Sequence, residues 1–149
     1  SDTNKHVKYG VVGLLGNIKD SKAVPVLCEA LNSGNDRVVN IAIRSLGKHE
    51  NIMAIEPLLE LFKQEKRFKN FIDITLTKII RSKKNSSIAS LVSTISEEDK
   101  ETYSFVVDLL AKQRPDCLII LGEFLTADKI DQSIKDKINN LMEAIESKS

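Results

Sequence analysis

Residues 22–47 have the sequence KAVPVLCEALNSGNDRVVNIAIRSLG, in which two helical patterns flank a short polar loop. In the first pattern, over residues 23–31, apolar residues recur at spacings of three and four, as in a helix that buries one stripe. The residues of this stripe are Ala23, Val26, Leu27, Ala30 and Leu31. Pro25 falls in the first turn, where its missing N–H costs little, and we expect Asp20 or Ser21 to cap the helix start.

The second pattern, over residues 36–47, has the same helical spacing. Its apolar residues are Val38, Val39, Ala42, Ile43 and Leu46. Asp36 is predicted as the N-cap, because a short side-chain oxygen there can accept a hydrogen bond from the first turn. Gly47 is predicted to end the helix as the residue just beyond its last turn.

The same pair of patterns occurs again when the chain is shifted on itself by 31 residues. The shift superimposes Leu15-Gly16 on Leu46-Gly47, Ala23 on Ala54, Val24 on Ile55, Leu27 on Leu58 and Leu31 on Phe62. A helix of the first type therefore recurs over residues 54–62, with Ala54, Leu58, Leu59, Leu61 and Phe62 as its apolar residues. The shift also predicts that Gly16 caps a helix, while Gly10 and Gly13 are expected to permit close helix packing.

Further helical patterns follow with more drift, over residues 68–81, 86–95, 96–110, 115–125 and 130–146. The apolar residues that we expect to be buried there are Phe68, Phe71, Ile72, Ile74, Leu76, Ile79, Ile80, Ile88, Ala89, Leu91, Val92, Ile95, Tyr103, Phe105, Val106, Val107, Leu109, Leu110, Leu118, Ile119, Leu121, Leu125, Ile130, Ile134, Ile138, Leu141, Met142 and Ile145. No segment shows the apolar alternation of a half-buried strand. The sequence predicts an all-α fold of roughly nine helices, stacked as antiparallel pairs because one pair cannot bury its apolar face alone.

The composition is that of an ordinary folded domain. Of the 149 residues, 42% are apolar, and 22 Lys and Arg nearly balance 21 Asp and Glu. Disordered chains combine few apolar residues with a large net charge, so disorder is excluded as the main state. No apolar run reaches the ~20 residues of a membrane span, and residues 1–6 lack the apolar stretch of a secretory signal. We therefore expect a cytoplasmic protein that has no membrane partner.

The repeated pair resembles HEAT repeats, and more specifically the short PBS-lyase-like (bilin lyase-like) class. The pattern of that class is similar to Ala-Val-Pro-x-Leu in the first helix, then Asp-x-x-Val and Ala-x-x-x-Leu-Gly in the second. The matching residues are Ala23, Val24, Pro25, Leu27, Asp36, Val39, Ala42, Leu46 and Gly47, whereas Asn40 stands where the family usually has Arg. The match is nearly complete over about residues 7–62, and only helix lengths and spacing persist over residues 63–149. The resemblance implies one α-solenoid domain over residues 1–149, with about four to five repeats.

The resemblance implies a binding surface more than a chemistry, since members are mainly scaffolds and adaptors for other proteins and the fold alone does not choose among roles. In this family the helices of the second type line the concave face. Their non-core positions give the candidate partner-binding residues Arg37, Asn40, Arg44, Lys48, Asn70, Asp73, Thr77, Arg81, Ser104, Asp108 and Lys112. We predict a non-enzymatic scaffold that binds a segment of another protein, and expect reversal of Arg37 and Arg44 to Glu to weaken that binding. A plain solvated helix face is the alternative, which spacing does not separate from a binding face.

Charge distribution leaves a second partner class open. Residues 1–84 hold 15 basic and 9 acidic residues, whereas residues 85–149 hold 7 basic and 12 acidic ones. The basic residues concentrate in segment 63–84, which could contact phosphates or steer an acidic partner. Nucleic acid is the less favoured partner, because the whole chain is near neutral and few aromatic residues are available for base stacking.

Residues that could carry chemistry are few. The chain has two histidines, His6 and His49, and the one His-Glu pair, His49-Glu50, falls in a predicted loop. Deoxyhypusine hydroxylase, which resembles this repeat class, uses several such pairs for two irons, so we predict no metal site here. Cys28 and Cys117 lie among apolar neighbours, where free cysteine is usually a small buried hydrophobe. We predict no catalytic residue and no cofactor, with a subunit of a bilin-lyase-like or other modifying complex as the alternative function.

Overall fold

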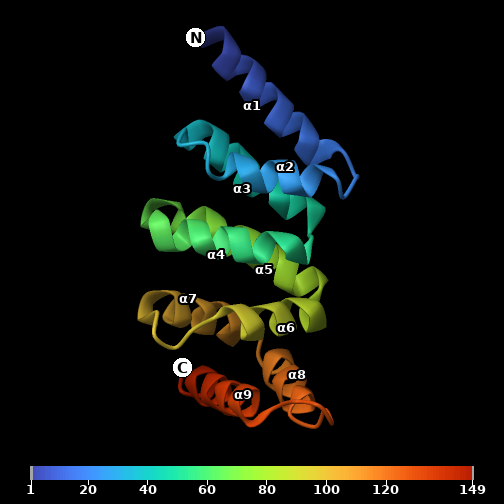
Figure 1. Cartoon of the computed structure of the whole chain (residues 1–149), viewed down its shortest axis with the longest axis vertical. Helices are drawn as coiled ribbons and strands as arrows, with labels where there is room; N and C mark the ends of the chain where they lie inside the picture. Colours follow the sequence, from blue (N-terminus) through green and yellow to red (C-terminus); the bar gives the residue numbers. More distant parts are fainter. Residues whose placement is uncertain (1, 149) are drawn as a thin grey trace. The chain divides into compact units, whose positions relative to one another are not determined.

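The computed structural model describes the backbone of residues 2–148 and the side chains of residues 10–148. Within this range the chain forms nine α-helices and two short 3-10 helices, without a strand (Figure 1). The α-helices are α1 (Asp2–Asn17), α2 (Ala23–Ala30), α3 (Asp36–His49), α4 (Ile55–Gln64), α5 (Lys69–Ser82), α6 (Lys84–Thr94), α7 (Lys100–Ala111), α8 (Asp116–Phe124) and α9 (Gln132–Glu146). The 3-10 helices are η1 (Ile52–Ala54) and η2 (Lys66–Phe68). The predicted all-α fold is confirmed.

The chain divides into two compact units, residues 1–83 and residues 84–149. The first unit contains α1 to α5, and the second contains α6 to α9. The division falls beside residue 84, where the balance of basic and acidic residues changes sign along the sequence. The interpretation of residues 1–149 as a single domain stays a prediction.

The first unit is a short α-solenoid of stacked helix pairs. Helix α3 packs against α1 on one side and α5 on the other, while α2 and α4 pack on α3 and α5 respectively. The α2–α3 pair therefore lies between α1 and the α4–α5 pair (Figure 1). The 31-residue shift predicts that α4 is equivalent to α2, and the apolar spacing over residues 68–81 predicts α5 as its partner.

The second unit repeats the principle of stacked helices with less regular sequence. Helix α7 packs on α9, α6 packs on α8, and α8 contacts α9. The Arg114 side chain ties the loop before α8 to the end of α9, because its Nη1 donates a hydrogen bond to the Ile145 carbonyl at 3.2 Å. Lys84 at the start of α6 forms an ion pair with Asp116 at the start of α8.

The predicted apolar stripes of α3 and α4 are confirmed at every position. Leu46, Leu58 and their neighbours in these two stripes are at most 4% exposed. In the other helices most of the predicted core residues are buried or half-buried, and those that are exposed outside α5 are Val26, Ala89, Ile119 and Ile134. In α2, Val24 takes the buried position instead of Val26. Successive helical residues point about 100° apart. Where apolar residues cover more of the helix surface than the buried stripe, the sequence does not show which of them face the core.

The N-caps of α2 and α3 differ from the predicted residues. Asn35, not Asp36, is the N-cap of α3, and its Oδ1 accepts hydrogen bonds from the N–H groups of Arg37 and Val38 at 3.0 and 3.3 Å. Asp36 is instead the first helical residue, where a negative charge complements the helix dipole. Lys22, rather than Asp20 or Ser21, is the N-cap of α2, and its own side chain makes no capping bond. The Asp20 carboxylate nevertheless accepts a hydrogen bond from the Lys22 N–H at 2.9 Å in the turn just before the helix.

The glycine predictions are also wrong in part. Gly16 and Gly47 do not end their helices, because α1 continues to Asn17 and α3 to His49, with Glu50 in the left-handed conformation (φ 50°) as the C-cap of α3. Gly16 is the position of close packing, where a Cβ atom would lie 2.7 Å from the Cβ of Ser45. A Cβ on Gly10 or Gly13 would meet nothing closer than 4.0 Å in the part of the chain whose side chains are described.

Hydrogen bonds between repeats fix the register of α1, α3 and α5. The Ser45 hydroxyl donates to the Val12 carbonyl at 3.4 Å, and the Thr75 hydroxyl donates to the Ile43 carbonyl at 3.1 Å. Both hydroxyls are buried, where a polar group needs a hydrogen-bond partner. Each finds that partner in a backbone carbonyl of the preceding helix of the stack. The two bonds stand one repeat apart, which makes them equivalent.

Candidate functional site

A groove of about 880 Å³ runs over α1, α3 and α5 in the first unit. We call it the α1/α3/α5 groove. Each of the three helices contributes four residues, one turn after another along one face. The lining residues are Gly10, Gly13, Leu14, Asn17, Ile41, Arg44, Ser45, Lys48, Phe71, Ile74, Thr75 and Lys78.

The lining positions are equivalent from one helix to the next. They form the rows Gly10–Ile41–Phe71, Gly13–Arg44–Ile74, Leu14–Ser45–Thr75 and Asn17–Lys48–Lys78, which follow a spacing of 31 and then 30 residues. We call the first the apolar row and the last the basic row. The Lys48 Nζ donates to the Asn17 Oδ1 at 3.0 Å, so members of the basic row are neighbours in space. The groove is therefore formed by the equivalent face of three successive repeat helices.

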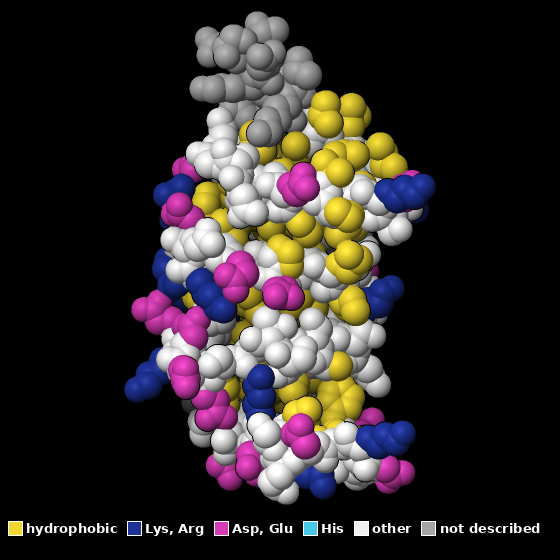
Figure 2. All heavy atoms as spheres, viewed as in Figure 1, with side chains coloured by type: hydrophobic (Ala, Val, Ile, Leu, Met, Phe, Trp, Pro, Cys, Tyr) yellow, Lys and Arg dark blue, Asp and Glu magenta, His cyan; other side chains and the backbone are white. Residues whose placement is uncertain are grey.

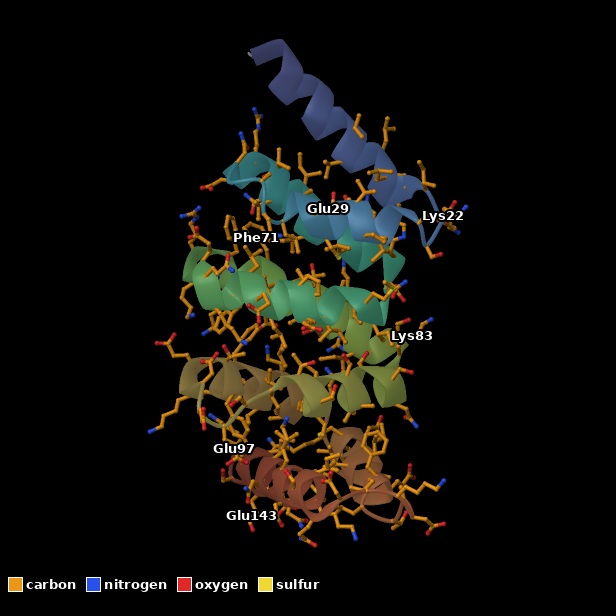
Figure 3. All side chains as sticks on the ribbon, in the orientation of Figure 1. Lys22, Glu29, Phe71, Lys83, Glu97 and Glu143 are labelled. Carbon is orange, nitrogen blue, oxygen red and sulfur yellow. The ribbon has the colours of Figure 1, made fainter. Side chains whose placement is uncertain are left out.

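Large apolar side chains are exposed along this groove. Leu14 is 64% exposed, Phe71 41% and Ile74 57%. Figure 3 shows Phe71 between the ribbons of α3 and α5. The prediction that Phe71 and Ile74 are core residues is wrong, because the core of α5 is formed by its other face. Exposed apolar clusters of this kind mark interaction surfaces in folded proteins.

The structure brings two of the predicted partner-binding residues into the groove, Arg44 and Lys48. Other candidates of the first unit lie outside its lining, and these are Arg37, Asn40, Asn70, Asp73, Thr77 and Arg81. The groove stripe of α5 is rotated by about one residue from the predicted stripe, which corresponds to roughly 100°. Contact of any of these residues with a partner stays a prediction.

The predicted residues outside the groove have identifiable surroundings. Thr77 donates a hydrogen bond to Asp73 one turn earlier on α5 at 3.3 Å. Asn40, at the family's usual Arg position, has a buried Oδ1 that lacks a hydrogen-bond partner among the described residues. An Arg–Asp pair between repeats is present all the same, since Arg67 before α5 donates to Asp36 of α3 at 2.8 Å.

The candidates of α7 are Ser104, Asp108 and Lys112, all exposed in the second unit. Asp108 forms an ion pair with Lys148 beyond the end of α9, at 3.0 Å. This pair links α7 to the carboxyl-terminal helix of the same unit. The Asp108 carboxylate therefore already has a cationic partner, Lys148, within the chain.

Several basic residues of segment 63–84 take part in interactions within the chain. Lys66 donates to the Phe62 and Lys63 carbonyls at 3.0 Å each, which satisfies the end of α4. Arg67 pairs with Asp36 and with Glu65, the latter at 3.1 Å. On the face in view in Figure 2, Lys and Arg side chains alternate with Asp and Glu, without a continuous basic patch among its described atoms. These observations favour a structural role for Lys66 and Arg67 over phosphate binding.

His49 has a structural position at the end of α3. Its Nε2 lies 2.8 Å from the Leu15 carbonyl of α1, so Nε2 carries the proton and donates it to that oxygen. Among the described side chains, no three His, Cys, Asp or Glu residues gather as a metal site requires. The side chain of His6 lies outside the described residues.

Burial lowers the reactivity of both thiols. It raises the pKa of Cys28 and of Cys117 above their ordinary value of 9.0. Because the thiolate is the nucleophile, a raised pKa leaves less of it near neutral pH. This argues against Cys28 as an attachment point for a chromophore.

We expect iodoacetamide to alkylate Cys28 more slowly at pH 8 than it alkylates a cysteine in a short unstructured peptide. The sign follows from the raised pKa, since the thiolate fraction at any pH below it is smaller than in the peptide. The rate should continue to rise above pH 9.0. Mass spectrometry of quenched samples measures it, with the urea-unfolded chain as control. An equal rate in the folded and unfolded chains would contradict the burial argument.

The first unit is an α-solenoid of stacked helix pairs with an exposed groove across α1, α3 and α5. Residues 1–69, from α1 to the start of α5, match the family model of HEAT repeats. The match does not separate the short PBS-lyase-like class from other HEAT repeats, so that finer assignment stays a prediction. No curated protein and no solved structure is significantly similar to the chain. None of the helices in the described range is both long and apolar enough to span a bilayer.

Proposed function

We propose that this chain is a non-enzymatic scaffold that binds a segment of a partner protein in the α1/α3/α5 groove. HEAT repeats typically serve as scaffolds for protein–protein interaction, and residues 1–69 match them. The observation that carries the proposal is the exposure of Leu14, Phe71 and Ile74 side by side with cations along one groove. Apolar surface of this extent gains free energy when a partner removes it from water.

The proposal is tested by affinity capture from a native lysate with two matched double variants. Arg44→Glu with Lys78→Glu reverses two cations that line the groove, one on α3 and one on α5. Arg37→Glu with Arg81→Glu makes the same change in charge on the same two helices, outside the groove lining. Mass spectrometry of the bound protein at moderate salt compares both variants with the unchanged chain.

We expect the groove variant to recover about tenfold less partner, because the introduced carboxylates repel the acidic groups of the partner that Arg44 and Lys78 attract. The control variant should recover as much partner as the unchanged chain. Equal loss in both variants would place the binding face on the stripe predicted from the sequence instead. Unchanged recovery in the groove variant would contradict the proposal, and circular dichroism confirms that each variant is folded.

Nucleic acid is distinguished in the same capture. Binding through the cations of segment 63–84 would fall steeply between low and moderate salt, because it depends on counterion release. Protein binding driven by apolar burial would persist at moderate salt. Recovery of nucleic acid alone would therefore overturn the scaffold proposal.

A further inference from the structure

The α1/α3/α5 groove has two chemically different edges. Its apolar row, Gly10–Ile41–Phe71, offers hydrocarbon, while its basic row, Asn17–Lys48–Lys78, offers two cations. Arg44 adds a third cation one turn away from Lys48 on the same face of α3. Among the described residues that line the groove, three are basic and none is acidic.

These cations are available to a partner. The described ion pairs of the first unit engage Lys63 and Arg67, and none of them involves Arg44, Lys48 or Lys78. The Lys48 ammonium donates to the neutral Asn17 amide, which leaves its charge uncompensated. A groove lined by one sign of charge beside apolar walls raises the local concentration of oppositely charged ligands. The complementary ligand carries carboxylates along one edge.

The floor of the groove discriminates between backbone conformations. It consists of side chains on helices whose backbone groups are already paired, and its buried hydroxyls, Ser45 and Thr75, donate to the preceding helix. An extended segment pressed against this floor would lose hydrogen bonds to water without replacement. A helical segment satisfies its own backbone and presents only side chains to the groove.

The two glycines of α1 give the groove its depth at one end. Among the described residues, no heavy atom lies within 4 Å of a Cβ added to Gly10, and for Gly13 the nearest is Ile41 Cγ2 at 4.0 Å. The equivalent positions on α5 are filled by Phe71 and Ile74. A bulky apolar side chain of the ligand therefore fits over α1, against Leu14, more readily than over α5.

We infer that the α1/α3/α5 groove binds an amphipathic helix of a partner protein, with apolar residues at every third or fourth position and acidic residues along the flank that meets Arg44, Lys48 and Lys78. This inference rests on the proposed scaffold function and names the chemistry of its ligand. The apolar ridge of the helix lies against Leu14, Ile41, Phe71 and Ile74. Its largest side chain occupies the space above Gly10 and Gly13.

Three fluorescent peptides of about 18 residues, roughly five helical turns, test the inference by anisotropy titration. Two share one apolar face of Leu residues and differ in the flank, which is Glu in one and Lys in the other. The third has the Glu flank but two central Pro residues, which prevent a continuous helix. We expect the Glu-flanked helix to bind the full chain at least about tenfold more tightly than either of the other two.

Protein variants locate the binding. Gly13→Leu extends into the groove from α1, where an added Cβ meets nothing closer than 4.0 Å among the described residues, and should reduce affinity for the Glu-flanked helix by at least about tenfold. Gly122→Leu on α8, where an added Cβ also meets nothing within 4 Å, is the matched control and should leave it unchanged. Arg44→Glu with Lys78→Glu should invert the preference, so that the Lys-flanked helix binds better.

The inference fails if the Pro-containing peptide binds as well as the helix, if the flank charge makes no difference, or if Gly13→Leu has no effect. Those outcomes leave the scaffold proposal standing whenever the lysate partner is still lost on reversal of Arg44 and Lys78. Unchanged capture of the lysate partner by the groove variant overturns the scaffold proposal itself. The two failures are thus distinguishable.

Discussion

Leu46→Ala and Leu141→Ala should each destabilise one unit of the chain by about 3 kcal/mol and leave the other unit unchanged. Leu46 on α3 and Leu141 on α9 are both 0% exposed, and each lies in the core of its own unit. Truncation to Ala loses the transfer free energy of the removed methyl and methylene groups and leaves a cavity that the surrounding helices fill only in part. Stacked repeats contact their neighbours alone, so the loss stays within the unit that carries the change.

Hydrogen exchange followed by mass spectrometry at increasing urea measures the free energy of opening for each helix. In Leu46→Ala, the amides of α3 and α5 should open at lower urea, while those of α7 and α9 keep the profile of the unchanged chain. Leu141→Ala should give the reverse pattern. A common shift of all helices in either variant would show that residues 1–149 unfold as one cooperative domain.

Gly16→Ala should destabilise the first unit by about 2 kcal/mol, although Ala favours a helix over Gly by about 1 kcal/mol. The added Cβ would lie 2.5 Å from Ser45 Oγ, 2.7 Å from Ser45 Cβ and 3.1 Å from Ser45 Cα. Rotation of the Ser45 hydroxyl relieves only the first of these contacts and breaks its bond to the Val12 carbonyl. Helix α1 must therefore move away from α3.

Urea unfolding followed by circular dichroism measures this effect, and two further variants identify its cause. Gly10→Ala adds the same methyl group to the same helix at a position where no described atom lies within 4 Å, so it should stabilise the unit by up to about 1 kcal/mol. Ser45→Gly removes the Cβ that Gly16→Ala meets, and the double variant should recover much of the loss. Equal stability of Gly16→Ala and Gly10→Ala would contradict close packing at Gly16.

The sequence located the helices well because each carries a stripe of apolar residues at helical spacing. The patterns over residues 36–47 and 54–62 correspond to α3 and η1–α4, with every predicted core residue buried. The 31-residue shift predicted that α4 repeats α2, and the match of residues 1–69 to HEAT repeats agrees with a repeat there. Local periodicity and turn residues suffice for these features, since they depend on residues close together in the chain.

The binding groove was predicted less well. Arg44 and Lys48 were found because charged residues on a helix with a clear core stripe must face outward. Phe71 and Ile74 were assigned to the core of α5 because they are apolar and adjoin its stripe. One signal was present: Gly10, Ile41 and Phe71 fall in register with the repeat, as do the three other rows. Comparing equivalent positions across repeats would have identified the shared face.

The sequence by itself thus determined an all-α repeat architecture, the helix pairing in residues 1–69 and the absence of a strand pattern. Only the tertiary structure decided which apolar residues lack a neighbour, as at Leu14, Phe71 and Ile74, and which glycine is required by contact, as at Gly16. The physical reason is that helical period reports a direction around one helix axis, whereas burial depends on whether another helix lies in that direction. Packing partners are set by residues about thirty positions away, as in the Ser45–Val12 and Thr75–Ile43 hydrogen bonds.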